Sequence, residues 1–304
     1  MTKICLTIFF TFSLYFVSLT QNIKEMFFIA KQEVDSGHYD RALECYNNIL
    51  KIDPNNYEAY TERGSIRGKQ NKYTEAESDF SIAISINPYN ANTYLKRAVY
   101  RLLLQNYKGA ISDCNIAAEL EPHNPEVYIT RGIAKSYIRY FLGAKEDFTK
   151  AIEIDSTSSR AYANRGATRF YLEDSLGALE DYNKSIKFDS SSFSLYYSRA
   201  ALLSHMGRQY EAIKDFDMAI KLNPSYPDAY YRRGYAKEMI GDVQGAIYDY
   251  SKTIEINPYD AQALNNLGVL KIKTGKNKDG CSTLKKAQDL GYPDASKNIK
   301  LYCN

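Results

Sequence analysis

The chain has 304 residues, of which 44% are hydrophobic and 25% charged, which is typical of a soluble, folded protein. Its formal net charge is only +3, and the basic residues stand singly among acidic ones. Binding along a phosphate backbone needs a basic stripe or patch, so we expect no nucleic-acid partner. Tyrosine is unusually common, with 28 residues, and tryptophan is absent.

Residues 1–20 differ in character from the rest of the chain. After Lys3 come sixteen residues, Ile4 to Leu19, without a charged side chain. A membrane-spanning helix needs about twenty apolar residues, whereas the apolar part of a signal peptide is shorter. We therefore expect a signal peptide over 1–20 that is cleaved near Gln21, and export to the periplasm, the cell surface or the exterior. Because Thr20 is less usual than alanine at a cleavage point, an uncleaved anchor remains the alternative.

From about Ile23 onward, one pattern of residues recurs at intervals of 34. The segment at 42–54 returns in varied form at 76–88, 110–122, 144–156, 178–190, 212–224 and 246–258. A fixed period of this length is the signature of stacked repeats. We therefore expect eight repeat units and a closing helix, at 23–56, 57–90, 91–124, 125–158, 159–192, 193–226, 227–260, 261–294 and 295–304.

Each unit contains two predicted helices joined by a short polar turn. The apolar residues of the second helix share one face of a 3.6-residue period, as in the first unit at Ala42, Leu43, Tyr46, Ile49 and Leu50. The turns often contain glycine or asparagine, as at Gly37, Asn71, Gly207, Gly241 and Gly275. Proline ends most second helices because it cannot continue a helix, and Ser156 and Ser190 replace it in two units.

This pattern resembles the tetratricopeptide repeat family. An aromatic residue stands fourth in most units, a small residue stands eighth in all, and alanine stands twentieth in seven of eight. The resemblance covers about nine-tenths of the chain. It implies an all-α fold: an α-solenoid of eight helix-turn-helix repeats in a right-handed superhelix, closed by a C-terminal capping helix. A single helix pair cannot bury its apolar face alone, so stacking of neighbours is also the physical expectation.

Arginine stands seventh and aspartate twenty-third in the same six units. The first and last units lack both residues, so the two are present or absent together. That co-occurrence predicts a bidentate contact between the helices of each hairpin. A catalytic site is not expected in six identical copies, so we interpret the pairs as structural: Arg63–Asp79, Arg97–Asp113, Arg131–Asp147, Arg165–Asp181, Arg199–Asp215 and Arg233–Asp249.

No set of residues predicts catalysis, a cofactor or a metal site. The histidines, His38, His123 and His205, lack the spacing of a metal pair. Residues 64–70 carry two glycines and a lysine, as a phosphate-binding loop does, but the glycines are too close and Gln70 replaces the serine or threonine. We therefore expect no enzyme activity and infer no small-molecule substrate.

The cysteines suggest one disulfide. Cys281 and Cys303 lie about ten residues on either side of the turn LGYPD, so an antiparallel hairpin of the last repeat helix and a closing helix brings them level. In an oxidising compartment this favours a disulfide, and the alternative is two ordinary thiols. The ending also resembles the cap of exported bacterial members of the family. Cys45 and Cys114 are expected to be small buried side chains.

The resemblance also implies where a partner binds. In this family the first helices of the units line the concave face, and peptides or helices of partners lie in that groove. The second, fifth, ninth, twelfth and thirteenth places face it, and in the second unit they are polar. In later units they give a lining of Leu95, Val99, Leu102, Leu103, Ile129, Ile133, Tyr137, Phe170, Tyr171, Tyr197, Tyr231, Tyr235 and Met239.

We therefore expect a non-enzymatic scaffold that binds a peptide or helix of a protein partner in an apolar, tyrosine-rich groove. An exposed apolar stripe is usually a partner surface, although packing between neighbouring units would cover part of it. The alternative is a structural or self-associating subunit of an envelope complex, anchored if its N-terminus is not cleaved. The sequence leaves the oligomeric state open.

Overall fold

The predicted helices are present in the computed structural model, which describes residues 21–303. Within that range the chain forms helices and turns and no strand. The apolar period decides which face of each helix is buried: Ala42, Tyr46 and Ile49 are among the buried residues of α2 (Tyr39–Ile52). The all-α fold expected from the sequence is therefore confirmed.

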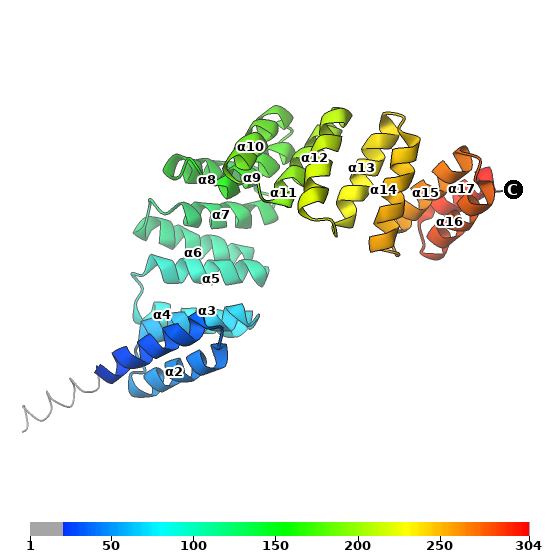
Figure 1. Cartoon of the computed structure of the whole chain (residues 1–304). Coiled ribbons are helices and arrows are strands. Elements are labelled where there is room, and N and C mark those ends of the chain that lie inside the picture. Colours follow the sequence, from blue (N-terminus) through cyan, green and yellow to red (C-terminus); the bar gives the residue numbers. More distant parts are fainter. Residues whose placement is uncertain (1–20, 304) are drawn as a thin grey trace, which may run out of the picture. The chain divides into compact units, whose positions relative to one another are not determined.

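The helices follow one another as antiparallel hairpins (Figure 1). In the first of two compact units, Met1–Ile154, the described helices are 21–35, α2, α3 (Tyr57–Lys69), α4 (Tyr73–Ile86), α5 (Ala91–Leu103), α6 (Tyr107–Leu120), α7 (Pro125–Tyr137) and α8 (Phe141–Ile154). In the second, Asp155–Asn304, they are α9 (Ser159–Tyr171), α10 (Ser175–Phe188), α11 (Phe193–His205), α12 (Gln209–Leu222), α13 (Pro227–Met239), α14 (Val243–Ile256), α15 (Ala261–Lys273), α16 (Asn277–Asp289) and α17 (Pro293–Tyr302).

Side-chain caps set where many of the helices begin. The Asn56 side chain accepts a hydrogen bond from the backbone N–H of Ala59, and Asn90 does the same for Thr93 one repeat later. Asp242 caps a second helix, α14, in the same way. Such caps satisfy backbone N–H groups that have no partner within the helix, which stabilises each by about 1 kcal/mol.

The turns between repeats are held by the residue that precedes proline or serine. Asp53 accepts from the backbone N–H two residues later. Where Ser156 and Ser190 replace proline, the turn gains a second bond: the hydroxyls of Thr157 and Ser191 donate to Asp155 and Asp189 at 2.7 Å. These hydroxyl bonds lower the pKa of both aspartates.

The turn inside each hairpin always contains one residue with positive φ. It is glycine at Gly37, Gly207, Gly241 and Gly275, but it is Gln105 (φ 60°), Arg139 (φ 62°) and Glu173 (φ 63°) in the middle of the chain. Left-handed backbone is unfavourable for such side chains. The turn geometry is therefore imposed by the packing of the two helices, and the middle repeats adopt it without glycine.

The small eighth residue of each repeat lets the two helices of a hairpin approach closely. A methyl group at Gly234 would lie 3.1 Å from the ring of Tyr250 and from the Asp249 Cβ atom. Other repeats place alanine here, and Ala30, Ala98 and Ala200 are all fully buried. This close approach also sets the distance over which the paired arginine and aspartate meet.

The C-terminal end of the repeat array differs slightly from the expectation. The closing helix α17 begins at Pro293, two residues before the expected start at 295, because proline suits the first position of a helix. The predicted signal peptide lies outside the described residues. Among the described helices, none combines the length and apolar character that a membrane span requires.

Candidate functional site

Each arginine at the seventh place binds the aspartate of its own hairpin through two nitrogens. Arg233 Nη2 lies 2.6 Å from Asp249 Oδ1, and its Nε lies 2.9 Å from Oδ2. The same two-nitrogen contact joins the other five predicted pairs, Arg63–Asp79, Arg97–Asp113, Arg131–Asp147, Arg165–Asp181 and Arg199–Asp215. Asp249 is completely buried, so its carboxylate is not open to a substrate.

The arginines also reach the second helix of the preceding repeat. Arg233 Nη1 donates to Asp217 at 2.6 Å, and its guanidinium lies 5.5 Å from the ring centroid of Tyr230. Matching contacts are Arg63–Asn47, Arg97–Ser81, Arg131–Asn115 and Arg199–Asn183. Burial alone would lower the pKa of Arg233, but the hydrogen bonds and attraction of Asp249 and Asp217 raise it. Each of these arginines therefore joins its hairpin to its neighbour.

A second cation binds most of the same aspartates. It stands four residues after the paired arginine and contacts the same carboxylate: Arg67, Arg101, Lys135, Arg169 and Lys237. The sixth repeat has Leu203 at this place, so Asp215 binds only Arg199 among the described cations. Sequence reasoning missed this partner because the place alternates between arginine and lysine, although its fixed spacing was a readable signal.

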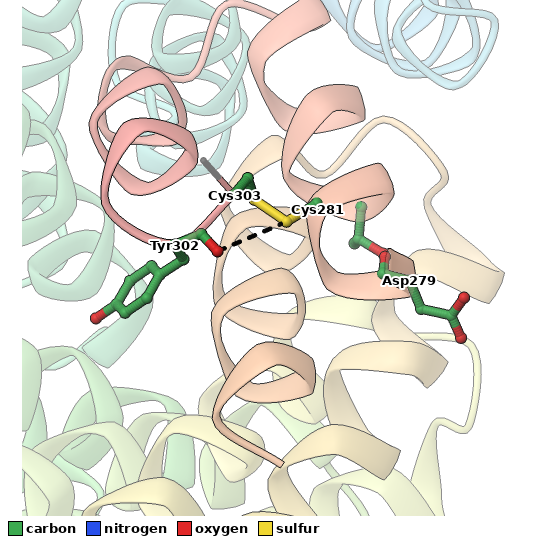
Figure 2. The surroundings of a disulfide bond; sticks show 5 residues. Asp279, Cys281, Tyr302 and Cys303 are labelled. Carbon is green, nitrogen blue, oxygen red and sulfur yellow. Dashed lines mark hydrogen bonds between the residues drawn. A yellow bond between two sulfur atoms is a disulfide. The ribbon is translucent and has the colours of Figure 1, made fainter. Parts of the chain in front are cut away.

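A disulfide joins Cys281 of α16 to Cys303 at the end of α17, with the two Cα atoms 5.7 Å apart (Figure 2). The sequence had left open whether these are a disulfide or two thiols, and the structure pairs them. The Cys281 sulfur also lies 4.0 Å from the carbonyl oxygen of Tyr302. Since a disulfide sulfur carries no proton, this is a van der Waals contact. The bond fastens the closing helix to the last repeat.

The expected groove residues divide into exposed and packed side chains. Val99, Leu103, Tyr137, Tyr171, Tyr235 and Met239 are exposed. Among these, Leu103, Tyr137, Tyr171 and Met239 stand at the thirteenth place, the last residue of a first helix. Together with His205 we call them the thirteenth-place row, which has two residues in the first unit and three in the second. Tyr137 and Met239 expose 63% and 58% of their surface, which is unusual for large apolar side chains.

Other residues of the expected lining are used in packing. Leu95 and Leu102 pack against the core around Tyr94 and Cys114. Phe170, Tyr197 and Tyr231 pack against buried residues of the second unit, and Ile133 is partly buried. The expectation that Ile129 lines an open groove is wrong. Its side chain is fully buried, because the neighbouring helices cover the fifth place of this repeat.

Sequence reasoning missed a second group of exposed apolar residues. Leu142, Leu176 and Tyr210 stand at the eighteenth place, the second residue of a second helix, and are 57–71% exposed. Tyr140 is exposed just before α8. The signal was present, because these residues lie off the periodic apolar face of their helices. They widen the exposed apolar surface on the side of the hairpin turns in each unit.

Each unit has a hollow on the face of its first helices. In the first unit a cavity of about 430 Å3 is lined by residues of α3, α5 and α7, with Glu62, Lys69, Lys96 and Glu126 among them. In the second unit a cavity of about 660 Å3 contains Tyr231, Tyr235 and Met239 together with Ser204, His205 and Arg232. The first hollow carries balanced charge, whereas the second contains no acidic side chain.

Two titratable groups, one in the second hollow and one in the core of the first unit, have raised pKa values. Burial, and then the nearby Tyr292, raises the pKa of Tyr231 to about 12, so its hydroxyl stays protonated at neutral pH. Burial raises the pKa of the Cys114 thiol to about 12, which leaves no reactive thiolate. Across residues 21–303, no cluster of histidine, cysteine, aspartate and glutamate side chains has the arrangement of a metal site.

Family models described as tetratricopeptide repeat match four segments of the chain, at 30–71, 57–90, 205–241 and 228–258. The solved structure of a tetratricopeptide repeat protein from Parabacteroides merdae superposes with a TM-score of 0.63, covering 82% of this chain and 99% of that one. The chain therefore contains tetratricopeptide repeats. At 22% identity, the likeness to the Parabacteroides merdae protein concerns the fold alone.

Two further solved structures resemble part of this chain. The match to the structure of MamA covers 54% of this chain and 96% of the MamA chain, at 27% identity and a TM-score of 0.51. YrrB is described as a tetratricopeptide repeat protein with an unusual peptide-binding site. The match to its structure covers 61% of this chain and 95% of the YrrB chain, at 22% identity and a TM-score of 0.52.

Two curated relatives match short segments. A DnaJ protein P58IPK homolog B from Oryza sativa subsp. japonica is 38% identical over 52 residues, 17% of this chain. RNA polymerase II-associated protein 3 from Xenopus tropicalis is 45% identical over 49 residues, 16% of this chain. The matched segments span only 11% and 8% of the length of those proteins.

Proposed function

We propose that this protein is a non-enzymatic scaffold that binds a peptide or helix of a partner protein on the face of its first helices. The observation that carries the proposal is the thirteenth-place row. At one repeated place, helix after helix ends in a large exposed side chain, four of them apolar or tyrosine. Exposed patches of this kind mark partner surfaces, and tyrosine supplies much contact area at low entropic cost.

Neighbouring contacts support a rigid binding surface. Tyr137 stacks on Tyr107 with ring centroids 4.8 Å apart and an interplanar angle of 6°. In the second unit, Phe170 packs edge-on against His205 at 5.1 Å. Side chains that are already held in place lose little conformational entropy when a partner binds. The paired arginines support the same view, because they lock the helices that carry the row.

The proposed location is outside the cytoplasm, in the periplasm, on the cell surface or in the exterior. Two features support it: the apolar segment at 4–19, and the disulfide near the C-terminus, which is a bond of oxidising compartments. Mass spectrometry of the N-terminus of the purified native protein tests it. A chain beginning near Gln21 is expected, and an intact Met1 in a membrane fraction would favour the anchored alternative.

A peptide-selection experiment tests the binding function. Short random peptides are selected on the full chain, and their affinity is measured for the wild type and for a Tyr235→Ala, Met239→Ala variant. We expect the variant to bind about tenfold or more weakly, since both side chains are exposed and central to the surface. Tyr231 is left unchanged because it packs on Tyr250 at 5.5 Å, and its loss would perturb the fold.

The matched control is Tyr248→Ala with Tyr259→Ala, which removes two exposed tyrosines from α14 and the turn after it. Equal affinity of all three proteins would contradict the proposed surface. Sedimentation of the same proteins separates the alternative function. Oligomers of the wild type that dissociate in the Tyr235→Ala, Met239→Ala variant, without any peptide binding, would indicate a self-associating subunit instead.

A further inference from the structure

The hollow of the second unit has an unusual charge distribution. Its lining residues include Ser204, His205, Tyr231, Tyr235 and Met239, and the formal charge among them is Arg232 on α13. No aspartate or glutamate lines it. Asp228 stands one turn before Arg232 on α13, accepts from the hydroxyl of Tyr226 at 3.4 Å, and forms no ion pair with Arg232. The cavity therefore combines aromatic walls with one positive charge that no carboxylate within residues 21–303 contacts.

Arg232 is positioned without being neutralised. Its Nε donates to the hydroxyl of Tyr197 at 2.7 Å, and its guanidinium lies 5.7 Å from the centroid of the Tyr197 ring. Within residues 21–303 it forms no ion pair with a carboxylate. Arg233, the next residue, is instead bound by both Asp217 and Asp249. The contact with Tyr197 uses Nε, and a guanidinium can bind a carboxylate through its two terminal nitrogens.

The first unit provides an internal comparison at the same place of the repeat. There Lys96 stands where Arg232 stands in the second unit, and it is neutralised by Glu62 at 3.1 Å and bonded to Ser65 at 2.9 Å. Glu62 lies 34 residues before Lys96. The residue 34 places before Arg232 is Ser198, which has no charge. In the first hollow Glu62 therefore neutralises Lys96, whereas in the second hollow no acidic residue stands at the equivalent place to neutralise Arg232.

We propose that this hollow binds an extended partner segment through an aspartate or glutamate side chain, with Arg232 holding its carboxylate. An apolar side chain beside that acidic residue packs on Tyr235 and Met239, which are exposed at the same cavity. A carboxylate fits better than a phosphate group, because the lining contains no second cation to balance a doubly charged ligand. The inference rests on the proposed peptide-binding function and names the chemistry of the ligand.

The test uses three matched sets of short synthetic peptides that differ at one central residue: glutamate, glutamine or phosphoserine, each next to an aromatic or aliphatic residue. Binding to the full chain is measured at low and at physiological salt. We expect the glutamate peptides to bind about tenfold more tightly than the glutamine peptides, the effect of one charge-assisted contact. The preference should shrink as salt increases, because the contact is open to solvent.

Variants assign the preference to Arg232. Arg232→Gln and Ser198→Glu should each abolish it, the first by removing the charge and the second by supplying the counter-charge that Glu62 gives to Lys96. Lys187→Gln makes the same charge change at an exposed residue of α10 and should leave the preference intact.

The outcomes separate this inference from the proposed function. If glutamate and glutamine peptides bind equally and tightly, the peptide-binding surface stands and the acidic ligand is wrong. A stronger preference for phosphoserine would also overturn the carboxylate. If no peptide of any set binds while the protein is folded, the proposed function fails together with the inference.

Discussion

The seventh-place arginines are the residues through which adjacent repeats are tied together. In the last hairpin of the first unit, Arg131 binds Asp147 of its own hairpin and Asn115 of the hairpin before it. Lys135 contacts the same aspartate at 2.7 Å. Burial alone would lower the pKa of Arg131, but Asp147 raises it above the usual value. Two cations therefore depend on one buried carboxylate.

Removal of the Asp147 carboxylate should lower the stability of the protein. Asp147→Asn leaves Arg131 and Lys135 without a counter-charge, and breaking a buried pair in this way lowers the free energy of unfolding by about 3–5 kcal/mol. Urea denaturation and the melting temperature measure the loss. Glu119→Gln, at an exposed residue of α6, is the control and should change stability by less than about 0.5 kcal/mol. An unchanged melting temperature for Asp147→Asn would contradict the structural role.

A second prediction at this scale concerns the left-handed turn residues. Arg139→Gly should raise the free energy of unfolding by about 0.5–1 kcal/mol, because relief of the strained backbone exceeds the entropic cost of glycine. Gly207→Ala, at the equivalent place of the sixth repeat with φ 77°, should lower it by a similar amount. Urea denaturation of both variants gives the comparison. Destabilisation by Arg139→Gly would show that the arginine side chain contributes more than its backbone costs.

At the scale of helices, the last hairpin is the place where stacking stops. Ala295 of helix α17 is buried in the core of the final repeat, and Tyr292, just before the helix, is partly buried there. The disulfide joins the end of α17 to α16. Inner repeats are held by neighbours on both sides, whereas the last has one. Terminal repeats of a solenoid need such an adapted cap.

The disulfide should contribute measurably to the stability of this end. Replacement of both Cys281 and Cys303 by serine should lower the free energy of unfolding by about 3 kcal/mol, because the bond closes a loop of 22 residues. Hydrogen exchange should accelerate mainly in α16 and α17. Thiol titration of the denatured protein checks the bond directly: reduction should release two further thiols, and the same count before and after reduction would contradict it.

The sequence predicts helices better than surfaces, for a physical reason. The helical period and the 34-residue repeat are visible in the sequence itself, so they predict α2 and the equivalent helices. The joint presence of Arg233 and Asp249 in the same repeats likewise predicts their contact. The burial of Ile129 and the exposure of Leu142 depend on neighbouring helices, which the pattern of one repeat does not contain. The contact of the second cation, such as Lys135, could have been predicted from its fixed spacing. That prediction required treating arginine and lysine as equivalent at one place of the repeat.

At the scale of the whole molecule, each repeat contacts its neighbours, and the same place recurs on successive helices. Side chains that differ between repeats at one such place therefore decide what the surface binds. The thirteenth place is charged in the outer repeats, at Asp35, Lys69 and Lys273, and apolar, tyrosine or histidine in between. We therefore propose that the inner group binds the partner, whereas the paired charges contribute to stability.

A photoreactive amino acid placed in the chain tests this claim most directly. Inserted at Tyr235 on α13 it should cross-link a partner protein in the native cell, and inserted at Tyr248 on α14 it should not, although both side chains are exposed. The Met239→Ala substitution should weaken the adduct at Tyr235. Adducts of equal yield from both positions, or from Tyr248 alone, would contradict the assignment of partner binding to the first helices.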